Sequence, residues 1–346
     1  MSHSDPLRRY VRQTRFAPLG EEGQRRLMAS GALVCGCGAL GSTLANLLVR
    51  AGVGTVRIVD RDFVEASNLQ RQVLFDEEDA AAGLPKAVAA AARLARINST
   101  VRIEPVVADI DFRNLPQLAE GMQVIVDGTD NFETRLLLND LALESGTPWV
   151  YGGCVGAEGQ TMTIVPGRTP CLRCLIPECP PPGSTPTCDT AGILGPIVGV
   201  IASIQAMEAL KILSGNEEAI SSRLTIVDLW TARVRQVELG SLREQIDCPA
   251  CKHGERAWLA GKMGSRWAVL CGRNAVQLSM PQTGPMSLEG LAARLAALGE
   301  VTRNPYLVRL KVEGYELTIF ADGRAIVGGT DDPAVARTVY AQYVGT

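Results

Sequence analysis

Residues 32–72, ALVCGCGALGSTLANLLVRAGVGTVRIVDRDFVEASNLQRQ, decide the fold of this chain. The stretch opens with apolar residues at 32–34, which predict a short buried strand. Gly36, Gly38 and Gly41 follow at the spacing G-x-G-x-x-G. This spacing lets a backbone turn sharply, approach a phosphate closely and pack a helix against the strand. We therefore expect a strand, a glycine turn and a helix.

The second half of the stretch completes a nucleotide-binding pattern. Residues 42–50 continue at helical period, and a helix that starts here would direct its free N–H groups and its positive dipole end at an anion. Residues 56–59 predict a second buried strand. Asp60 follows that strand, where a carboxylate can accept hydrogen bonds from both hydroxyls of a ribose. Together these features predict a nucleotide site.

The next loop indicates which nucleotide is bound. Asn68 and Arg71 lie in the segment SNLQRQ at 67–72, and Lys86 ends the segment GLPK at 83–86, where a helix opens. Two such cations suit a triphosphate whose pyrophosphate must leave, because charge-assisted hydrogen bonds stabilise the departing group. An NAD site has little use for them. The alternative is that Arg71 and Lys86 are ordinary surface charges.

Several independent motifs of the chain resemble those of one known family. They are GCGALG at 36–41, VDRDFVEASNLQRQ at 59–72, GLPK at 83–86, GTDN at 128–131 and two later Cys-x-x-Cys pairs. Over roughly residues 7–254 the chain resembles the ThiF/MoeB/HesA adenylyltransferases, bacterial relatives of the ubiquitin-activating enzymes. The agreement of unrelated motifs makes chance similarity a poor explanation.

The resemblance implies a nucleotidyltransferase that uses ATP and Mg²⁺ to adenylate the C-terminal glycine of a small ubiquitin-like sulfur carrier protein ending in Gly-Gly. A sulfur donor protein would then replace AMP with sulfur. The pathway stays open: thiamin, molybdopterin, cysteine or tRNA thiolation. The residues implied in catalysis are Arg71, Lys86, Asp130, Arg12 and Cys188. Those implied in nucleotide binding are Gly36, Gly38, Ala39, Gly41, Asp60, Asp62, Ser67, Asn68, Arg71, Lys86, Asp130 and Asn131.

Asp130 admits two interpretations. It follows the predicted strand 123–127 and precedes the predicted helix 131–144, so it lies on the ligand side of a parallel sheet and could hold magnesium. A plain helix cap formed by Asp130 or Asn131 explains the position almost as well. In the family that the chain resembles, the matching aspartate is the magnesium ligand.

The ten cysteines indicate a metal site rather than disulfides. The N-terminal residues MSHSDPLRRYVRQ contain no apolar signal segment, so we expect a cytoplasmic protein with reduced thiols. Cys171, Cys174, Cys248 and Cys251 form two Cys-x-x-Cys pairs, which can fill all four positions around zinc and leave none open for water. We therefore expect a structural zinc site that joins two distant segments, the alternative being four unrelated thiols.

A proline-rich segment lies between the cysteine pairs. Residues 179–192, CPPPGSTPTCDTAG, cannot form a helix or a central strand and predict an exposed crossing loop. Its Cys188 resembles the ThiF cysteine that bonds covalently to the carrier, although similar MoeB cysteines do not depend on such a bond. A structural thiol is the equal alternative. Cys179 could act as a resolving partner if Cys188 is modified.

Further features concern the partners. Arg12 matches the family arginine that reaches into the neighbouring subunit's ATP site, so the resemblance implies a homodimer. The net charge of −3 argues against nucleic acid, which would require a basic stripe. The longest apolar run, residues 192–204, is too short to span a membrane and predicts a buried helix.

The order of elements predicts an α/β fold in two domains. We expect residues 1–258 to form a Rossmann-like, doubly wound, mostly parallel sheet, preceded by a helical arm at 7–28 with Tyr10, Phe16 and Leu19 as apolar contacts. Residues 259–346 should form a small α/β domain of unknown role. There we expect a strand at 267–279, a helix at 287–298, a meander over 306–327 and a last helix at 332–343.

Other functions stay open. A relative could activate another carboxylate or dehydrate a tRNA nucleoside, although the charge speaks against tRNA. The first strand–helix–strand unit alone would suit an NAD-dependent dehydrogenase, which leaves the Gln70-Arg71 loop unexplained. A non-catalytic scaffold should have lost Arg71 or Lys86, and both are present.

Overall fold

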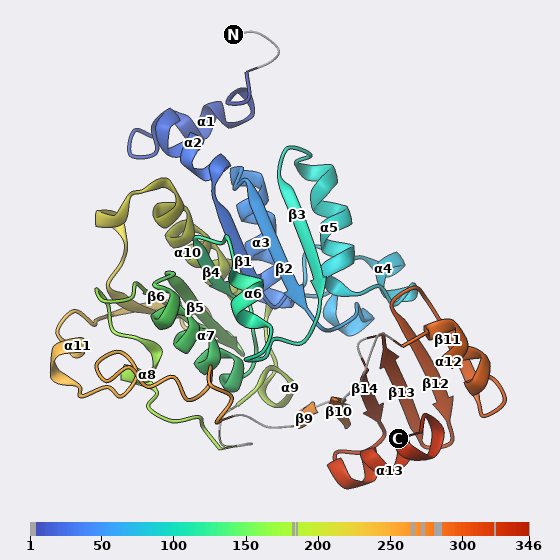
Figure 1. Ribbon diagram of the computed structural model, residues 1–346. Coiled ribbons are helices and arrows are strands. Elements are labelled where there is room, and N and C mark those ends of the chain that lie inside the picture. Colours follow the sequence, from blue (N-terminus) through green and yellow to red (C-terminus); the bar gives the residue numbers. More distant parts are fainter. Residues whose placement is uncertain are drawn as a thin grey trace. The chain divides into compact units, whose positions relative to one another are not determined.

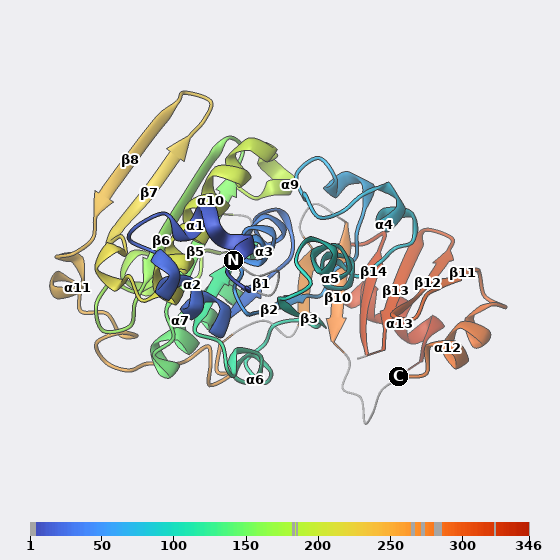
Figure 2. The same ribbon diagram turned by 90° about the horizontal axis from the view of Figure 1, so that it is seen from above.

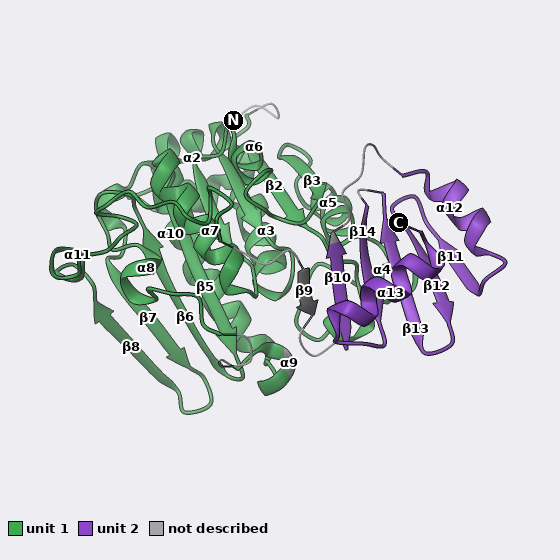
Figure 3. Cartoon of the chain, turned by 60° about the horizontal axis from the view of Figure 1, so that its bottom comes forward, with its two compact units in different colours: residues 1–263 green, residues 264–346 purple. Residues whose placement is uncertain are grey.

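The computed structural model describes residues 5–181, 184, 186–263, 267–270, 274–279, 286–321 and 323–345. The chain divides into two compact units, residues 1–263 and residues 264–346, coloured green and purple in Figure 3. Each unit has its own sheet and its own apolar core. They are described in turn.

An eight-stranded sheet forms the centre of the first unit, in the order β3-β2-β1-β4-β5-β6-β7-β8 (Figure 1). The strands from β3 to β5 pair in parallel, and β6, β7 and β8 add an antiparallel extension. The predicted doubly wound, mostly parallel sheet is therefore confirmed, while β7 and β8 were not expected. The strands are β1 (Gly31–Cys35), β2 (Thr55–Asp60), β3 (Arg102–Val107), β4 (Val124–Asp127), β5 (Trp149–Val155), β6 (Glu158–Ile164), β7 (Arg223–Asp228) and β8 (Arg233–Glu238).

Helices cover both faces of this sheet, as Figure 2 shows from above. Side chains of α3 (Ala39–Ala51), α5 (Lys86–Ile97) and α10 (Gly195–Ser214) pack on one face with alternate strand residues. The other face packs against α6 (Leu115–Ala119) and α7 (Phe132–Ser145). The remaining short helices are η2 (Ala66–Asn68), α4 (Glu77–Ala81), α8 (Leu172–Leu175), α9 (Cys188–Ala191), η3 (Glu217–Ala219) and α11 (Leu242–Gln245).

Helix α10 is the one helix among the described residues that is both long and strongly apolar. By length and composition it could cross a membrane, but 56% of its most apolar window is buried inside the protein. Ile197, Ile201 and Ala209 pack in the core against the sheet and α3. The helix predicted around residues 192–204 is therefore a core helix that begins at Gly195 and continues to Ser214.

The carboxyl end of β1 is built on a close crossing of backbones. Gly36 has a φ of +84°, which side-chain-bearing residues rarely adopt. A Cβ added to Gly41 would lie 1.8 Å from the carbonyl oxygen of Gly36, and one added to Gly128 would lie 2.7 Å from the same oxygen. The predicted glycine turn therefore brings the start of α3, the end of β1 and the segment after β4 into contact.

The N-terminal arm lies at the other end of the sheet, where the parallel strands begin (Figure 1). It consists of η1 (Arg8–Tyr10), α1 (Val11–Thr14) and α2 (Gly20–Ala29). The ring of Tyr10 packs on Gly52, and its hydroxyl accepts a hydrogen bond of 2.8 Å from Asn98 Nδ2. Leu19 packs against the core, but Phe16 is 65% exposed, so its prediction as an apolar contact of the arm was wrong.

The end of the crossing segment is helical, which corrects the prediction of a loop through residue 192. Thr187 and Thr190 form a capping box, in which each side chain accepts a hydrogen bond from the other residue's backbone N–H. Because the last proline of the segment is Pro186, nothing prevents the short helix α9 from starting at Cys188.

The second unit contains a six-stranded antiparallel sheet in the order β11-β12-β13-β14-β10-β9. Its core packs the sheet against both helices of the unit. The single strand predicted at 267–279 is wrong: two strands pair there in antiparallel fashion, and residues 271–273 between them lie outside the described residues. The elements are β9 (Trp267–Leu270), β10 (Ala275–Ser279), α12 (Leu288–Leu295), β11 (Glu300–Arg303), β12 (Leu307–Val312), β13 (Tyr315–Phe320), β14 (Arg324–Gly328) and α13 (Pro333–Tyr343).

The backbone crossing predicts that a single methyl group added at Gly41 destabilises the fold. Gly41→Ala should lower the free energy of unfolding by about 3 kcal/mol, because the backbone of Gly36 cannot move away from the new Cβ. Gly199→Ala is the matched control, since this glycine also lies in a helix but has open space around its Cβ position. It should be neutral or stabilise by about 0.5–1 kcal/mol. Equal urea midpoints for both variants would contradict the assignment.

Candidate nucleotide site

The candidate site lies where β2, β1 and β4 end side by side. Cys35, Asp60 and Asp127 are the last residues of these three parallel strands. The chain continues from β1 to β2 and β3 on one side of β1, and it then crosses to β4 and β5 on the other side. The strand order therefore reverses between β1 and β4. Ligands of open α/β sheets bind at such a point.

Asp60 holds the glycine turn in place. Its Oδ2 accepts a hydrogen bond of 2.5 Å from the N–H of Cys37, and its Oδ1 accepts one of 2.6 Å from the N–H of Asp62. Burial raises the pKa of the carboxyl, whereas Lys86 acts to lower it. Each oxygen keeps a second lone pair, so the predicted contact with ribose hydroxyls stays a prediction.

Lys86 is a buried cation rather than a surface charge. Its side chain is 4% exposed, and its Nζ lies 3.2 Å from Asp62 Oδ2. The backbone N–H of Lys86 donates to the carbonyl of Asp62 at 2.9 Å, so the start of α5 is tied to the end of β2. A buried ammonium requires a compensating charge. Asp62 supplies it beside the glycine turn.

Residues 67–72, called the polar loop below, follow β2 and pack against the glycine turn. Asn68 is 3% exposed, and its Oδ1 accepts a hydrogen bond of 2.9 Å from Gln72 Nε2. That amide lies 3.8 Å from the Cβ position of Gly38. Among the described residues, Gln72 Oε1 has no hydrogen-bond partner. Gln72 was quoted in the motif but not assigned to the site, and its burial beside Gly38 makes it a site residue that the sequence reasoning missed.

The other residues predicted in this loop are less buried. Arg71 is half-buried, and its guanidinium donates to the carbonyl of Ser67 at 3.1 Å. Ser67 is exposed, and its hydroxyl accepts a hydrogen bond of 3.1 Å from Asn68 Nδ2. Ala39 is the first residue of α3. The loop thus keeps Asn68 fixed and leaves the Arg71 guanidinium near the surface.

The segment after β4 shows whether Asp130 caps the following helix. Asn131 caps α7, because its Oδ1 accepts a hydrogen bond of 2.8 Å from the N–H of Thr134. Asp130 is exposed and is not the cap. Its carboxylate lies close enough to Arg61 and Arg135 to act on the pKa of both guanidinium groups. Asp130 is thus available as a ligand.

Arg135 positions this segment and was not predicted. Its Nε lies 3.3 Å from Asp127 Oδ2, and its guanidinium donates to the carbonyls of Thr129 at 2.7 Å and Gly152 at 3.1 Å. Asp127 in turn accepts hydrogen bonds from the backbone N–H and the hydroxyl of Thr129. This buried ion pair therefore fixes the turn that carries Asp130. The available signal was an arginine placed directly before the apolar residues 136–138 of this helix.

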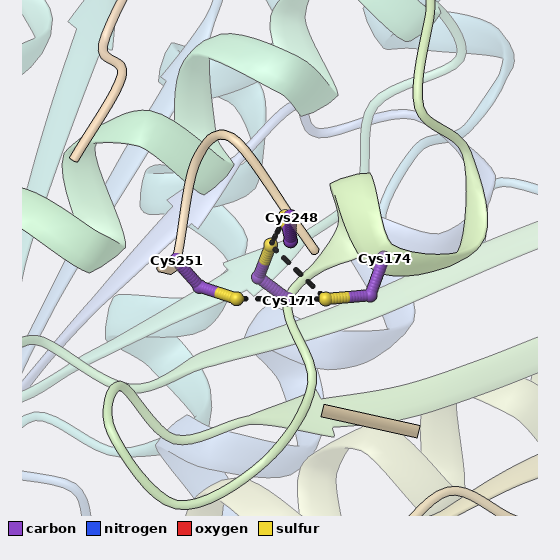
Figure 4. Close-up of side chains that lie close together, drawn as sticks. All are labelled: Cys171, Cys174, Cys248 and Cys251. Carbon is purple, nitrogen blue, oxygen red and sulfur yellow. Dashed lines mark hydrogen bonds between the residues drawn. The ribbon is translucent and has the colours of Figure 1, made fainter. Parts of the chain in front are cut away.

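The four cysteines of the paired motifs meet as predicted (Figure 4). Their sulfur atoms all lie within 4.8 Å of one another, with 3.9 Å between Cys171 and Cys174, 3.7 Å between Cys171 and Cys248, and 3.5 Å between Cys174 and Cys251. Sulfur atoms about 2.3 Å from a tetrahedral zinc ion lie roughly 3.8 Å apart. The cluster therefore fits such an ion. An ion pair of 3.0 Å between Arg173 and Glu255 joins the same two segments.

The last two predicted residues lie apart from the strand ends. Arg12 is an exposed residue of the arm at the opposite edge of the sheet. Cys188 contacts β5, with its Sγ 3.6 Å from the carbonyl oxygen of Cys154. Farther along, a Cβ at Gly195 would lie 3.1 Å from the carbonyl oxygen of Gln70, so the start of α10 lies against the polar loop.

The fold and this site define a nucleotide-binding α/β protein with a cluster of four cysteines that fits a metal ion. The model of the ThiF family matches residues 10–250, so the chain belongs to the ThiF family and the resemblance found in the sequence is confirmed. The sulfur carrier protein ThiS adenylyltransferase of Bacillus subtilis is 45% identical over 338 residues, which are 97% of this chain and 99% of that protein. The SAMP-activating enzyme E1 of Haloferax volcanii is 44% identical over 248 residues, covering 72% of this chain and 90% of that one.

Solved structures extend the comparison of the fold. The crystal structure of Escherichia coli MccB with MccA-N7isoASN superposes with a TM-score of 0.59 at 21% identity, covering 70% of this chain and 74% of that one. At this identity the likeness concerns the architecture alone.

The ion pair between Arg135 and Asp127 leads to a prediction about stability and its dependence on pH. Arg135→Ala should lower the free energy of unfolding by about 3–5 kcal/mol, because Asp127 stays buried without its partner. Burial already raises the pKa of Asp127, and removal of Arg135 raises it further. Since the folded variant then binds this proton more tightly than the folded wild type, the deficit in stability relative to wild type should grow as pH rises from the raised pKa of Asp127 in wild type towards its still higher pKa in the variant.

Urea titrations at pH 5 and pH 8 measure this dependence. Arg50→Ala is the control, since this exposed arginine of α3 bonds only to Asn46 among the described residues and should change stability by about 0.5 kcal/mol or less at either pH. If the loss of unfolding free energy in Arg135→Ala became smaller with rising pH, the charged form of Asp127 would not depend on Arg135.

Proposed function

We propose that the protein uses MgATP to adenylate the C-terminal glycine of a ubiquitin-like sulfur carrier protein that ends in Gly-Gly, preparing it for thiocarboxylate formation. The observation that carries the proposal is buried Lys86, paired with Asp62 beside the glycine turn. The Bacillus subtilis relative, matched along almost its whole length, is named for this reaction. A sulfur donor protein is the further partner that this chemistry requires.

The chain's own groups can perform this reaction without a general base. A carboxylate must attack the α-phosphate while pyrophosphate leaves, so the enzyme mainly positions two anions and neutralises charge. The turn from Gly36 to Gly41 presents backbone N–H groups and the start of α3 to the α-phosphate. Lys86 and Arg71 would stabilise the departing pyrophosphate together with Asn68.

Asp130 is the proposed ligand of magnesium. Its carboxylate is exposed at the carboxyl edge of the sheet, and the capping role falls to Asn131. Magnesium takes oxygen ligands and commonly binds through a carboxylate together with substrate phosphates. When bound, it would screen the charge of the triphosphate. Arg135 keeps the turn of Asp130 in one conformation through the carbonyl of Thr129.

ATP–pyrophosphate exchange tests the reaction. Candidate carriers ending in Gly-Gly should support exchange of label between pyrophosphate and ATP, and the same carriers without the two glycines should not. Lys86→Ala should reduce the rate at least a hundredfold, since an electrostatic contact to a transferring phosphoryl group contributes on that scale. No exchange with any carrier, together with NADH-dependent turnover, would end the proposal.

Zinc is the metal that we propose for the cysteine cluster. Four thiolates suit zinc, and a closed shell has no position for a reacting water. The cluster joins the chain around α8 to the segment after α11, far apart in the sequence. Its role is therefore architectural.

Loss of one cysteine should remove the metal and weaken the fold together. Cys174→Ser is expected to lower zinc content, measured by atomic absorption, and to lower the melting temperature in parallel, because the metal's binding energy contributes to folding. Cys179→Ser is the control: it lies in the same segment outside the cluster and should keep its zinc. Zinc-free wild-type protein of unchanged stability would refute the assignment.

We further propose a homodimer with composite sites. The arm that carries Arg12 is anchored by Tyr10 and Asn98 at the amino-terminal edge of the sheet, away from this chain's own nucleotide site. Arg12 would then serve the site of the neighbouring subunit. The outer side of α10 supports an interface, because Met207 is 54% exposed on this strongly apolar helix.

Mixed dimers test this arrangement. Arg12→Ala and Lys86→Ala proteins should each be nearly inactive, and heterodimers should recover about a quarter to a half of the wild-type exchange rate, since one of two sites is intact. Arg15→Ala, which alters another exposed arginine of the arm, should stay active alone. If heterodimers are demonstrated and no activity returns, Arg12 does not act across the interface.

A further inference from the structure

Two cysteines outside the metal cluster lie in contact near the end of β5. Cys154 is near the end of β5, and Cys188 is the first residue of α9, which packs on that strand. The Sγ of Cys188 lies 3.6 Å from the carbonyl oxygen of Cys154. The Sγ of Cys154 lies 4.0 Å from the carbonyl oxygen of Ile197 in α10. Both thiols are half-buried.

This pairing differs from the one suggested by the sequence. Cys179 packs with the apolar cluster on the α7 face of the sheet, where Glu133 acts to raise its pKa. Cys154 packs instead with the cluster on the α3 and α10 face. Cys188 contacts Cys154, and its thiol lies close enough to act on the pKa of the Cys154 thiol.

We propose that Cys154 and Cys188 form a reversible disulfide that fastens α9 to β5. The reaction consumes a low-molecular-weight disulfide such as oxidised glutathione. The Cys188 thiolate attacks one sulfur, releases one glutathione thiolate and becomes a mixed disulfide. The Cys154 thiolate then attacks Cys188 Sγ and displaces the second glutathione. The two protein thiols lose two electrons and two protons in total, and the oxidant gains them as two molecules of reduced glutathione.

The surroundings set the order of the two steps. Burial, together with the neighbouring Cys188, raises the pKa of Cys154 to about 12, so little of it is thiolate at neutral pH. This disfavours Cys154 as the first nucleophile and leaves the first step to Cys188. Once its sulfur is capped it carries no charge, which removes one of the two causes that hold the Cys154 pKa up. Because Cys154 is already next to the mixed disulfide on Cys188, its attack is favoured over attack by free thiols from solution.

The bond would restrain the segment that leads to the nucleotide site. After α9 the chain pairs with the β5–β6 turn, where Gly156 N donates to the carbonyl of Gly192 at 2.8 Å and Leu194 N donates to the carbonyl of Gly156 at 2.9 Å. Gly195 then contacts the polar loop at Gln70. The disulfide would add a covalent attachment at the start of this path, where α9 packs on β5 and Cys188 Sγ contacts the carbonyl oxygen of Cys154.

Peptide mapping after treatment with oxidised glutathione tests the pairing. Wild-type protein should yield a Cys154–Cys188 disulfide, resolved by tandem mass spectrometry and removed by dithiothreitol. Cys179→Ser should yield the same disulfide. Cys154→Ser should instead retain glutathione on Cys188. Metal content measured after treatment shows that the cysteine cluster is intact.

Several results would overturn the proposal. A Cys179–Cys188 disulfide in wild-type protein would assign the partner role to Cys179. Stable glutathione on Cys188 of wild-type protein, or no modification of Cys188, would show that Cys154 does not act as its partner. Because the wild-type map alone distinguishes these results, the proposal stays testable even if Cys154→Ser does not fold.

Discussion

The whole site depends on the absence of three side-chain carbons where β1 ends. Gly36, Gly41 and Gly128 bring three backbone segments within a distance that a single Cβ would block. This crossing places the start of α3 directly over the end of β1 and brings the turn after β4 against it. The free N–H groups of the helix, the carboxylate of Asp60 and the turn that carries Asp130 thereby face one small region. A phosphate-binding geometry follows from packing before any charged residue is considered.

The charges around this crossing are held in buried pairs. Asp62 compensates Lys86, and Asp127 compensates Arg135. Each pair costs desolvation energy, so its value lies in fixing geometry rather than in stability. Lys86 holds the end of β2 to α5, and Arg135 holds the turn after β4 to β5 through Gly152. Asp130 is exposed and Arg71 is half-buried, so both are open to a ligand beside the buried Lys86.

Much of this arrangement could be predicted because it depends on local spacing. The glycine turn, the end of β2 at Asp60 and the two cysteine pairs each have a pattern that one stretch of chain carries alone. Arg135 could not be placed in this way, since its role arises from carbonyls of two other segments. The same holds for Phe16, whose exposure depends on tertiary packing, and for the hairpin of β7 and β8, where alternation is obscured because β8 is exposed throughout. The helix α9 was hidden by the prolines before it.

A crystal structure with a non-hydrolysable ATP analogue and magnesium tests the central claim most directly. The account predicts the α-phosphate over the turn from Gly36 to Gly41, the β- and γ-phosphates against Asn68, Arg71 and Lys86, and the metal on Asp130. It also predicts that these backbone segments stay where they are, because the glycine crossing leaves them no room to move. A nucleotide bound elsewhere, or a triphosphate that makes no contact with Lys86, would contradict it.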